Sequence, residues 1–468
     1  MLFNSWVFIL LLIVTFVVYY LPRVGKAQVG ILIISSLIFY AYGQPGLLLL
    51  LLCSASINIL TSYMIVYGPA ARRKLYATLG VVINLGLLSY FKYGSLLAHT
   101  FMDTSQGVGH YLTMIPLPIG ISFYTFEGIS LLVDVYSNRH SDVLTIDKSI
   151  KKHITKTLFF ISFFPHLIAG PILKAYEFYP QIGEKSIKNV DWGYVFRKLT
   201  VGYFLKMVVA DNLSNVTFWM TAPYFQSKSS ITLIGMLLGY SFQIFADFAG
   251  YSMIALGLAK MFGYDLLENF NFPYISTSFS EFWRRWHISL STFLKEYLYI
   301  PLGGNRKGNF RTYFNLTITM VLGGLWHGAA WSYAVWGAFH GLALAIERLI
   351  NQTFHIKIDS KIGKILKGFM VFGFVTLAWL LFRLPFNDVV DYLKAIATNT
   401  HMRNDYLLLF SIMIYSAPVV LYHIFYLVPA EWRLHYAVSR YKYLAYGMML
   451  FLIAVNSGPS GSFIYFQF

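Results

Sequence analysis

The chain has 468 residues, of which 57% are hydrophobic and only 12% are charged. Soluble domains carry about 25% charged residues, so this composition excludes a soluble globular protein and indicates a membrane protein with several spans. The single cysteine, Cys53, excludes an intramolecular disulfide and any cysteine-rich metal site. The formal net charge of +16 fits basic cytoplasmic loops beside anionic lipid, with an anionic substrate as the alternative explanation.

Four apolar stretches near the N-terminus are clear candidates for membrane spans, since a span takes roughly 20 mainly apolar residues. They cover residues 5–21, 29–43, 46–67 and 75–91. The first lacks a basic flank and a small-residue cleavage site, so we expect a retained span rather than a cleaved signal peptide. Basic connectors, the first with Arg23 and Lys26, alternate with connectors of little charge. The positive-inside rule therefore predicts an N-terminus outside the cytoplasm.

The next apolar stretch, residues 111–135, is interrupted by prolines and glycines. The interrupting residues are Pro116, Pro118, Gly120 and Gly128. Broken backbone at membrane depth persists only where protein or water satisfies its polar groups, so we expect this stretch to lie in the protein interior. A basic loop with Arg139 follows it, and we expect that loop on the cytoplasmic side.

Further apolar stretches continue to the C-terminal end. They cover residues 157–169, 194–210, 231–246, 250–263, 313–325, 330–350, 364–384, 406–427 and 441–456. Several are shorter than a full span, so we expect about 11 spans in total, some of them tilted or re-entrant. No internal repeat of 20–50 residues is present. The sequence therefore predicts an all-α polytopic membrane bundle.

Acidic side chains in apolar stretches need an explanation, because polar groups inside a bilayer are costly. Asp247 lies four residues from Gln243 and four from Tyr251, so the three share one face of a helix. This face is either a hydrogen-bonded clamp between helices or the wall of a hydrated channel. The same two alternatives apply to Glu127 and Asp134.

The segment that begins "SEFWRRWHIS" is the densest polar stretch of the chain. On a continuous helix, Glu281 pairs with Arg284 or Arg285, and His287 faces Ser291 one turn later. Tryptophan beside arginine is also typical of a membrane interface, so an interfacial anchor is the alternative to a functional site. The "PLGGNRKGN" turn that follows favours the site, because flexible backbone amides with Arg306 and Lys307 suit a phosphate, although it is not a Walker motif.

His327 lies in "GGLWHGAAW" and His340 follows 13 residues later. On one helix they would lie about 220° apart, at roughly 100° per residue, so we do not expect them to pair. No metal-ligand spacing accompanies them, and the sequence predicts no metal site. Glycines beside His327 allow a ligand to approach closely, which favours a general base there. For His340 we favour a buried structural histidine.

Long motifs in a fixed order make the chain resemble the membrane-bound O-acyltransferases, and among them the bacterial alginate O-acetylation subgroup. The motifs are "MLFNSWVFI", "FFPHLIAGPILKAYEFYPQI" (163–182), "DFAGYSMIALGLAKMFGYDLLENFNFPY" (247–274), "FWRRWHISLSTFLKEYLYIPLGGNRKG" (282–308), "LGGLWHGAAWSYAVWGAFHGLAL" (322–344) and "FIYFQF". The subgroup usually has Arg-Asp where this chain has Lys295-Glu296, a change that keeps both charges.

The resemblance implies a single membrane domain over residues 1–468, with tilted and broken helices around a central tunnel. Its parts would be N-terminal helices (about 1–110), an acyltransferase core (about 111–384) and C-terminal helices (about 385–468). His327 and His287 would be catalytic. Arg306, Lys307, Arg284, Arg285 and Ser291 would bind the donor, and Asp247, Gln243, Trp326, His340 and Glu127 would line the tunnel.

The resemblance also implies the reaction and its partners. An acetyl group would pass from a cytoplasmic donor, acetyl-CoA, to an extracytoplasmic polysaccharide such as alginate, cellulose or peptidoglycan. A separate SGNH-type, esterase-like protein would carry the acetyl group onward to the polymer. We expect a multi-pass protein of the bacterial inner membrane, surrounded by lipid, with no permanently bound cofactor and no nucleic-acid partner.

Two alternatives stay open at this point. One is D-alanyl transfer to teichoic acid on the same fold. The other is a transporter or flippase with no bond-making step, which inverted repeats would favour, and none is evident in the sequence.

Overall fold

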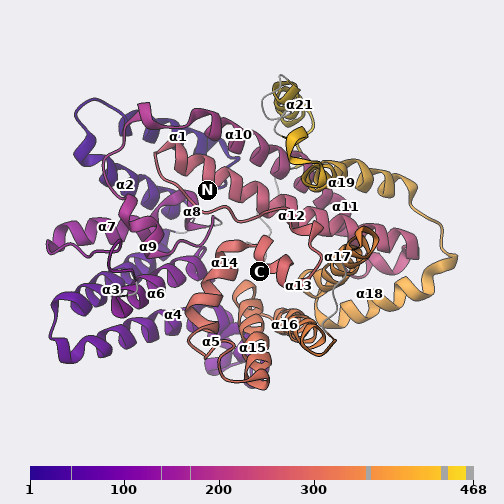
Figure 1. Cartoon of the computed structure of the whole chain (residues 1–468), viewed down its shortest axis with the longest axis horizontal. Coiled ribbons are helices and arrows are strands. Elements are labelled where there is room, and N and C mark those ends of the chain that lie inside the picture. Colours follow the sequence, from indigo (N-terminus) through magenta and orange to yellow (C-terminus); the bar gives the residue numbers. More distant parts are fainter. Residues whose placement is uncertain (44, 139, 169, 355–359, 434–440, 460–468) are drawn as a thin grey trace. The chain divides into compact units, whose positions relative to one another are not determined.

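The computed structural model describes residues 1–43, 45–138, 140–168, 170–354, 360–433 and 441–459. Within these ranges every regular element is a helix, which confirms the predicted all-α class (Figure 1). The expectations for Arg139 and for the "FIYFQF" motif fall outside the described residues.

The contacts group the chain into two compact units. The first comprises Met1–Lys198 and Ile254–Leu267, and the second comprises Leu199–Met253 and Glu268–Phe468. The division of one domain into N-terminal helices, core and C-terminal helices stays a prediction.

The first unit begins with the four helices that the sequence predicts. They are α1 (Trp6–Tyr19), α2 (Gln28–Ala41), α3 (Leu48–Tyr67) and α4 (Arg73–Phe101). The predicted stretch ended at residue 91, whereas the α4 helix continues to Phe101. The reason is that the Lys92 amine is buried and donates to Ser122 Oγ at 3.0 Å, so this lysine does not end the apolar helix.

The predicted interruption before residue 121 is confirmed at Gly120. After α5 (Gly107–Thr113), the chain is not helical around Pro116 and Pro118, and α6 (Ile121–Ser137) begins directly after Gly120. Gly120 has φ +79°, and a Cβ there would lie 2.6 Å from the Leu167 carbonyl oxygen. The predicted interruption at Gly128 was wrong, because α6 continues through this residue.

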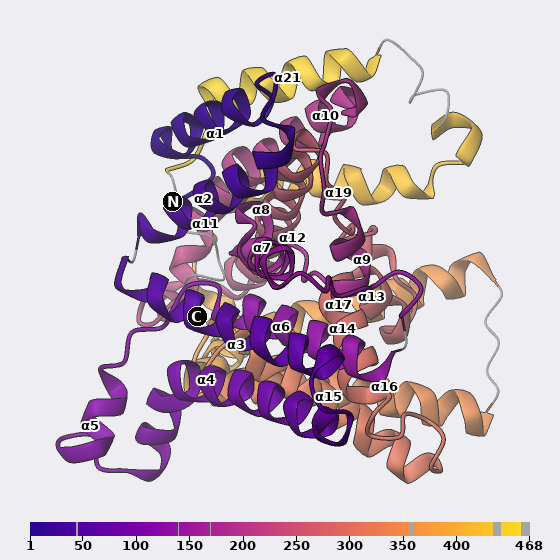
Figure 2. The ribbon, with the colours of Figure 1, turned by 90° about the vertical axis from the view of Figure 1, so that its left-hand side faces the viewer.

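Gly128 continues the α6 helix because it faces the Asn58 side chain of α3, where a Cβ would come within 2.5 Å of the amide. The α6 helix is almost entirely buried, as expected for an interior segment. It packs against α3 and α4, and the three helices lie side by side in Figure 2. The rest of the unit contains α7 (Ile150–Ser162), α8 (Phe164–Leu167) and α9 (Ala175–Phe178).

Two long helical runs contain residues of both units. The first is α10 (Trp192–Tyr203), continued by a π-helical turn at Phe204–Ala210 and by α11 (Asp211–Thr217). The second is α12 (Ser230–Met261), a single helix of 32 residues where the sequence predicts two stretches. The helix continues through Gly250 because that residue packs against backbone, with a Cβ position 2.9 Å from the Gly202 carbonyl oxygen.

The second unit carries the two histidine motifs on short helices and on one helical hairpin. The short helices are α13 (Phe279–Arg285) and α14 (Ile288–Leu294), followed by a π-helical turn at Lys295–Tyr299. The hairpin consists of α15 (Asn309–His327) and α16 (Trp331–Phe354), which lie side by side (Figure 1). Gly324, Gly337 and Gly341 each face backbone of the other helix, so the two helices approach closely.

The remaining helices of the second unit are α17 (Lys361–Arg383), α18 (Phe386–Thr398), α19 (Tyr406–Leu427) and α21 (Tyr441–Val455). Of these four helices, α18 is the one that does not correspond to a predicted apolar stretch. It is short and buries only Val389, Tyr392 and Ala395, too few apolar positions to stand out from the surrounding chain.

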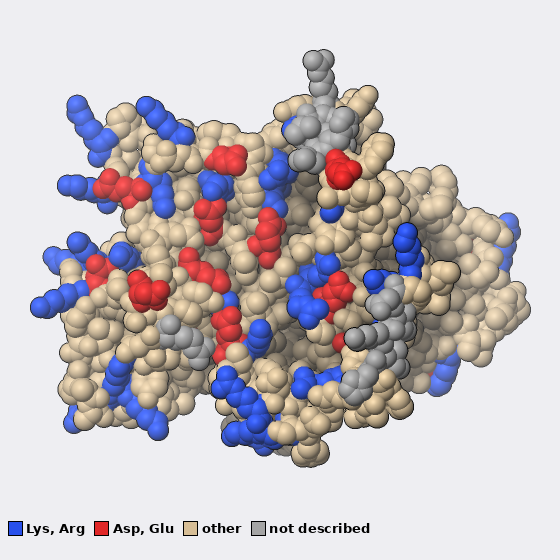
Figure 3. All heavy atoms as spheres, in the orientation of Figure 1, with Lys and Arg blue, Asp and Glu red and all other residues tan. Residues whose placement is uncertain are grey.

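Among the described residues, five helical segments are long and apolar enough to cross a membrane. They are Pro45–Tyr67, Ala70–Phe101, Ser230–Met261, Lys361–Arg383 and Tyr406–Leu427, and Trp6–Tyr19, Gly25–Ala41 and Tyr441–Val455 are shorter apolar helices. The charged side chains on the face in Figure 3 gather over its left and central parts and leave much of the right-hand part without charge. The protein is therefore a multi-pass membrane protein, and the total of about 11 spans stays a prediction.

Candidate functional site

The two histidines that were predicted to be catalytic lie next to each other in the second unit. Their ring centroids are 5.9 Å apart. His327 is the last residue of α15, and the chain leaves the helix at Gly328 in an extended conformation. His287 stands between α13 and α14 with φ 43° and ψ 56°. A left-handed conformation is uncommon for a residue with a side chain, and such strain gathers at functional sites.

The continuous helix expected around His287 was wrong. The α13 helix ends at Arg285 because the backbone there is hydrogen-bonded to the irregular segment around Asn269. The Asn271 N–H donates to the Arg285 carbonyl oxygen at 2.9 Å, and the Ile288 N–H donates to the Asn269 carbonyl oxygen at 3.0 Å. The Ser291 hydroxyl therefore does not face the His287 ring and donates to the Trp286 carbonyl oxygen at 3.3 Å.

Aromatic rings surround the His327 imidazole. Trp326, Trp336 and Phe382 meet it edge-on, with centroid distances of 5.1, 5.3 and 5.4 Å. The His327 side chain is 4% exposed, whereas His287 is completely buried. These rings limit the access of bulk water to both imidazoles.

His340 lies on α16 and belongs to the same aromatic cluster. It contacts Trp283 at 5.1 Å and Trp336 at 4.8 Å, and it is completely buried. Neither of its ring nitrogens has a hydrogen-bond partner among the described residues. Trp336 thus contacts both His327 and His340. The structural role favoured for His340 and its place along a tunnel both stay predictions.

A polar network on the other side of His287 was not anticipated. Asn269 is buried and its side-chain oxygen lies 3.3 Å from His287 Nδ1. The same oxygen accepts hydrogen bonds from Ser289, and the amide nitrogen donates to Ser252 Oγ. The available signal was a polar residue, Asn269, in the largely aromatic motif "ENFNFPY" shortly before His287 in the sequence.

The residues expected to bind the donor lie at two places in the second unit. Arg285 pairs with Glu281 at 2.9 Å, as predicted for a helix, and Arg284 donates to Ser280 Oγ at 3.0 Å. Arg306 and Lys307 are exposed in the turn before α15. Three glycines there have positive φ, namely Gly303, Gly304 and Gly308. Donor binding by these residues stays a prediction.

Two of the residues expected along a tunnel make polar contacts between helices. Asp247 of α12 lies 2.7 Å from the Lys206 amine, which also lies 2.7 Å from Asp211. Gln243 accepts a hydrogen bond from Thr217 Oγ1. These are the contacts of an interhelical clamp, and the lining of a tunnel stays a prediction. Lys206 was overlooked, although a lysine inside an apolar stretch was the signal.

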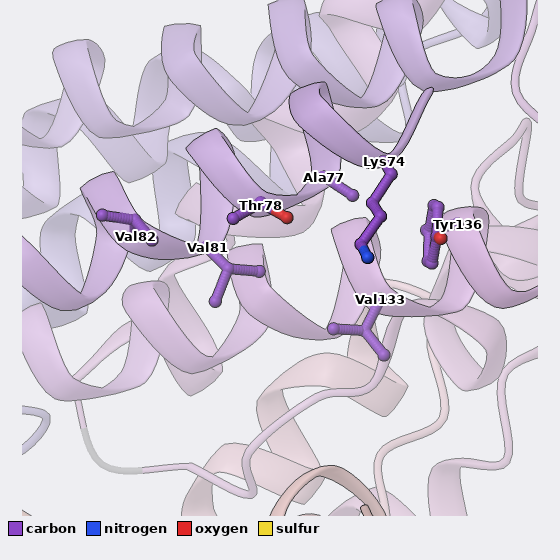
Figure 4. Close-up of a pocket in the computed structure, with 7 residues that line it drawn as sticks. All are labelled: Lys74, Ala77, Thr78, Val81, Val82, Val133 and Tyr136. Carbon is purple, nitrogen blue, oxygen red and sulfur yellow. The ribbon is translucent and has the colours of Figure 1, made fainter. Parts of the chain in front are cut away.

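Glu127 belongs to the first unit, where its carboxylate lies 2.8 Å from His166 Nδ1. Both side chains are completely buried. The first unit also contains a pocket of about 270 Å³ between α4 and α6, shown in Figure 4, toward which the Lys74 side chain extends. A pocket of about 470 Å³ lies between α12 and α19 of the second unit. None of the residues that line these two pockets is one of the predicted site residues.

Among the described residues, no group of three or more His, Cys, Asp or Glu side chains is arranged to hold a metal ion.

Comparison with known proteins identifies the class. The model of the family "MBOAT, membrane-bound O-acyltransferase family" matches residues 149–386, about half of the chain. The chain is 39% identical over 390 residues to the "Probable alginate O-acetylase AlgI" of Pseudomonas aeruginosa, which covers 82% of this chain and 72% of the relative. It is 35% identical over 376 residues to the "Peptidoglycan O-acetyltransferase" of Helicobacter pylori, covering 75% of this chain and 70% of the relative.

Similarity to the "Teichoic acid D-alanyltransferase" of Bacillus subtilis is lower, at 29% identity over 240 residues, covering 48% of this chain and 58% of that protein. The chain belongs to the membrane-bound O-acyltransferase family. It is a multi-pass membrane O-acyltransferase, as the motifs around His287 and His327 predict.

Proposed function

We propose that the protein transfers an acetyl group from acetyl-CoA on the cytoplasmic side to a hydroxyl group on the outer side of the membrane. The product would be an O-acetylated extracytoplasmic polysaccharide. The observation that carries the proposal is the approach of His287 and His327 to 5.9 Å between ring centroids, inside an aromatic enclosure. Two imidazoles so close to each other, from distant motifs, suit proton transfer at one reacting centre.

In this mechanism His327 is the general base. Its imidazole takes the proton of the incoming hydroxyl while the alcohol oxygen attacks the thioester carbonyl carbon. The carbon–sulfur bond of the tetrahedral intermediate then breaks, the acetyl ester remains on the alcohol, and the coenzyme A thiolate takes the proton from the imidazolium. Thiolate is a good leaving group, so the reaction needs no metal ion. His287 positions the donor or stabilises the charge that develops on the carbonyl oxygen.

The donor would be held through its phosphates. Arg306 and Lys307 supply two exposed cations in a turn with three glycines in the left-handed region, and backbone amides in such turns bind anions. Arg284, Arg285 and Ser291 would complete the donor site. Arg285 is already paired with Glu281, and Arg284 donates to Ser280 Oγ. The basic turn brings two exposed cations together beside flexible backbone, so it offers the stronger support.

The names of the relatives support a polysaccharide acceptor. Those with 35–39% identity over at least three quarters of this chain are named for acetylation of alginate or of peptidoglycan. The D-alanyltransferase of teichoic acid covers less of the chain at lower identity. We propose an acetylated polysaccharide of the alginate, cellulose or peptidoglycan kind, an SGNH-type esterase-like partner, and an inner-membrane location with the N-terminus outside.

The test uses the full chain in lipid vesicles with radiolabelled acetyl-CoA, a soluble polysaccharide acceptor and an SGNH-type esterase-like partner. We expect the wild type to transfer label to the acceptor and His327→Ala to lose transfer by at least about 100-fold, the usual minimum for a general base. His99→Ala, which removes an exposed histidine on α4, is the matched control. Transfer by His327→Ala at the wild-type rate would refute the proposal. Uptake of label into the vesicles without ester formation would favour the transporter.

A further inference from the structure

Asn269 uses each polar atom of its side chain in the network beside His287. Its Oδ1 accepts from the Ser289 backbone N–H at 3.1 Å and from the Ser289 hydroxyl at 2.8 Å, and it lies 3.3 Å from His287 Nδ1. Its Nδ2 donates to Ser252 Oγ at 3.0 Å. The side chain is 1% exposed, so no solvent competes for these contacts.

The orientation of this amide follows from the chemistry of its partners. A backbone N–H can only donate a hydrogen bond, so the Asn269 atom that faces the Ser289 nitrogen has to be the oxygen. The opposite orientation would place two N–H groups against each other. The two ends of an amide cannot otherwise be told apart from shape alone, and the Ser289 backbone removes that ambiguity.

The amide orientation fixes the tautomer of His287. An amide oxygen has lone pairs and no hydrogen, so the ring nitrogen that it contacts has to carry the hydrogen. His287 Nδ1 therefore carries the hydrogen, and when the ring is neutral Nε2 carries the lone pair. If Nδ1 were unprotonated, two lone pairs would face each other at 3.3 Å in a buried site.

The atom left over is His287 Nε2. It is buried, and it has no hydrogen-bond partner among the described residues. Buried polar atoms in proteins are almost always paired. This acceptor belongs to a residue with a left-handed backbone whose ring lies 5.9 Å from that of His327, so it is available to a ligand at that place. The backbone conformation of His287, with φ 43°, is held by the Ile288 N–H bond to the Asn269 carbonyl oxygen. One residue thus fixes both the backbone and the ring.

We propose that Asn269 is a positioning residue, which holds His287 as the Nδ1–H tautomer so that Nε2 accepts a hydrogen bond from an N–H or O–H group of the substrate. The inference rests on the proposed acetyl transfer. It decides between the two roles given to His287, because a neutral ring that accepts at Nε2 cannot donate to a carbonyl oxygen. The substrate group is either an amide N–H of the coenzyme A arm or the acceptor hydroxyl.

The first experiment observes the tautomer without any reaction. The full chain, labelled with ¹⁵N-histidine and reconstituted in lipid nanodiscs, is studied by NMR, and the His287 signals are identified by their loss in His287→Gln. We expect an unprotonated Nε2 and a protonated Nδ1 for His287 in the wild type, and loss of this preference in Asn269→Leu. A wild-type Nε2–H tautomer would overturn the proposal even in an active enzyme. The expected tautomer in a chain that transfers no acetyl group would instead refute the proposed function.

The second experiment compares Asn269→Asp with Asn269→Leu. A carboxylate keeps the acceptor for Nδ1–H and stabilises the imidazolium more than an amide does. The acidic limb of the pH–rate profile should therefore move to higher pH in Asn269→Asp, because more hydroxide is needed to reach the neutral ring. Asn269→Leu has no acceptor, and we expect kcat/KM to fall at least tenfold. The aspartate variant keeps the test decisive if the leucine variant does not fold.

The control is Asn399→Leu. Asn399 is a buried asparagine of the same unit whose amide donates to the Gln226 and Lys228 carbonyl oxygens and which contacts neither histidine. We expect no change in its pH–rate profile. In the Asn269 variants, a rise in KM for acetyl-CoA alone assigns the Nε2 partner to the coenzyme A amide, and a rise for the acceptor alone assigns it to the hydroxyl. Unchanged kinetics and pH profile in both variants would overturn the proposal.

Discussion

The amine of Lys206 lies 2.7 Å from a carboxylate oxygen of Asp247, and this buried ion pair joins the π-helical turn to α12. The same amine lies 2.7 Å from Asp211. A π-helical turn inserts one residue into a helix and is frequent at functional sites. Here it places a lysine between two carboxylates, so the stability of this part of the second unit depends on one amine.

Replacing Lys206 by methionine should therefore destabilise the protein strongly. Two buried carboxylates would lose their counter-ion, and breaking a buried pair in this way costs about 3–5 kcal/mol. Thermal and denaturant unfolding of the detergent-solubilised chain measures the loss. Lys394→Met is the matched control, because the Lys394–Asp391 pair at 3.1 Å is exposed and such pairs contribute about 0–1 kcal/mol. Equal stability of the two variants would show that the buried pair does not hold the helices.

The close packing of α15 and α16 leads to a second prediction. A Cβ at Gly337 would meet the Met320 carbonyl oxygen and lie 2.8 Å from Val321 Cα. Gly337→Ala should push the two helices apart, cost about 1–3 kcal/mol as overpacking does, and lower acetyl transfer by displacing His327 at the end of α15. Gly373→Ala on α17 is the control, since no atom lies within 4 Å of its Cβ position. Unchanged transfer in Gly337→Ala would mean that the hairpin spacing does not position His327.

Much of the fold could be predicted because its signals are local. The first four helices follow from runs of apolar residues, and the start of α6 follows from the prolines and the glycine before residue 121. The single α12 helix could not be predicted, since Asp247 in its middle is neutralised by Lys206, a residue far away in the sequence. Tertiary pairing of this kind leaves no periodic pattern in either segment.

The candidate site was predictable only in part for the same reason. The resemblance to a family singled out His287 and His327, but no residue spacing places their rings 5.9 Å apart. Asn269 was missed because its importance depends on the orientation of one amide. The helix break at His287 was missed because it is held by backbone bonds to the segment around Asn269 rather than by a proline or glycine.

A third prediction concerns acid stability at the start of α19. Asp405 caps this helix by accepting the Leu408 N–H at 3.1 Å, and it pairs with Lys228 at 3.0 Å. The hydrogen bond from Lys228 lowers the pKa of Asp405, and the Leu408 N–H acts in the same direction. A lowered folded-state pKa contributes stability above the unfolded value of about 3.9, and that stability is lost as the pH falls through the folded value.

The melting temperature of the wild type should therefore fall more between about pH 6 and about pH 3 than that of Asp405→Asn, which keeps a capping oxygen but not the charge. The difference should be small and should shrink in high salt, because the pair is partly exposed. Asp391→Asn, at an exposed pair, is the control. An identical pH dependence of wild type and Asp405→Asn would exclude a contribution from this ionised group.

The basic turn before α15 supports the last prediction. If Arg306 and Lys307 hold the donor phosphates, then Arg306→Ala/Lys307→Ala should raise KM for acetyl-CoA by about tenfold, equivalent to ~1.4 kcal/mol, with kcat almost unchanged. Acetyl-dephospho-CoA, which lacks one phosphate, tests whether the rise in KM is due to lost phosphate contacts. Its KM with the wild type should exceed that of acetyl-CoA, and the double substitution should raise it by a smaller factor than it raises the KM for acetyl-CoA. Lys151→Ala/Lys152→Ala removes two exposed lysines of the first unit and controls for total charge. An unchanged KM in the turn variant, or an equal rise in the control, would place the donor phosphates elsewhere.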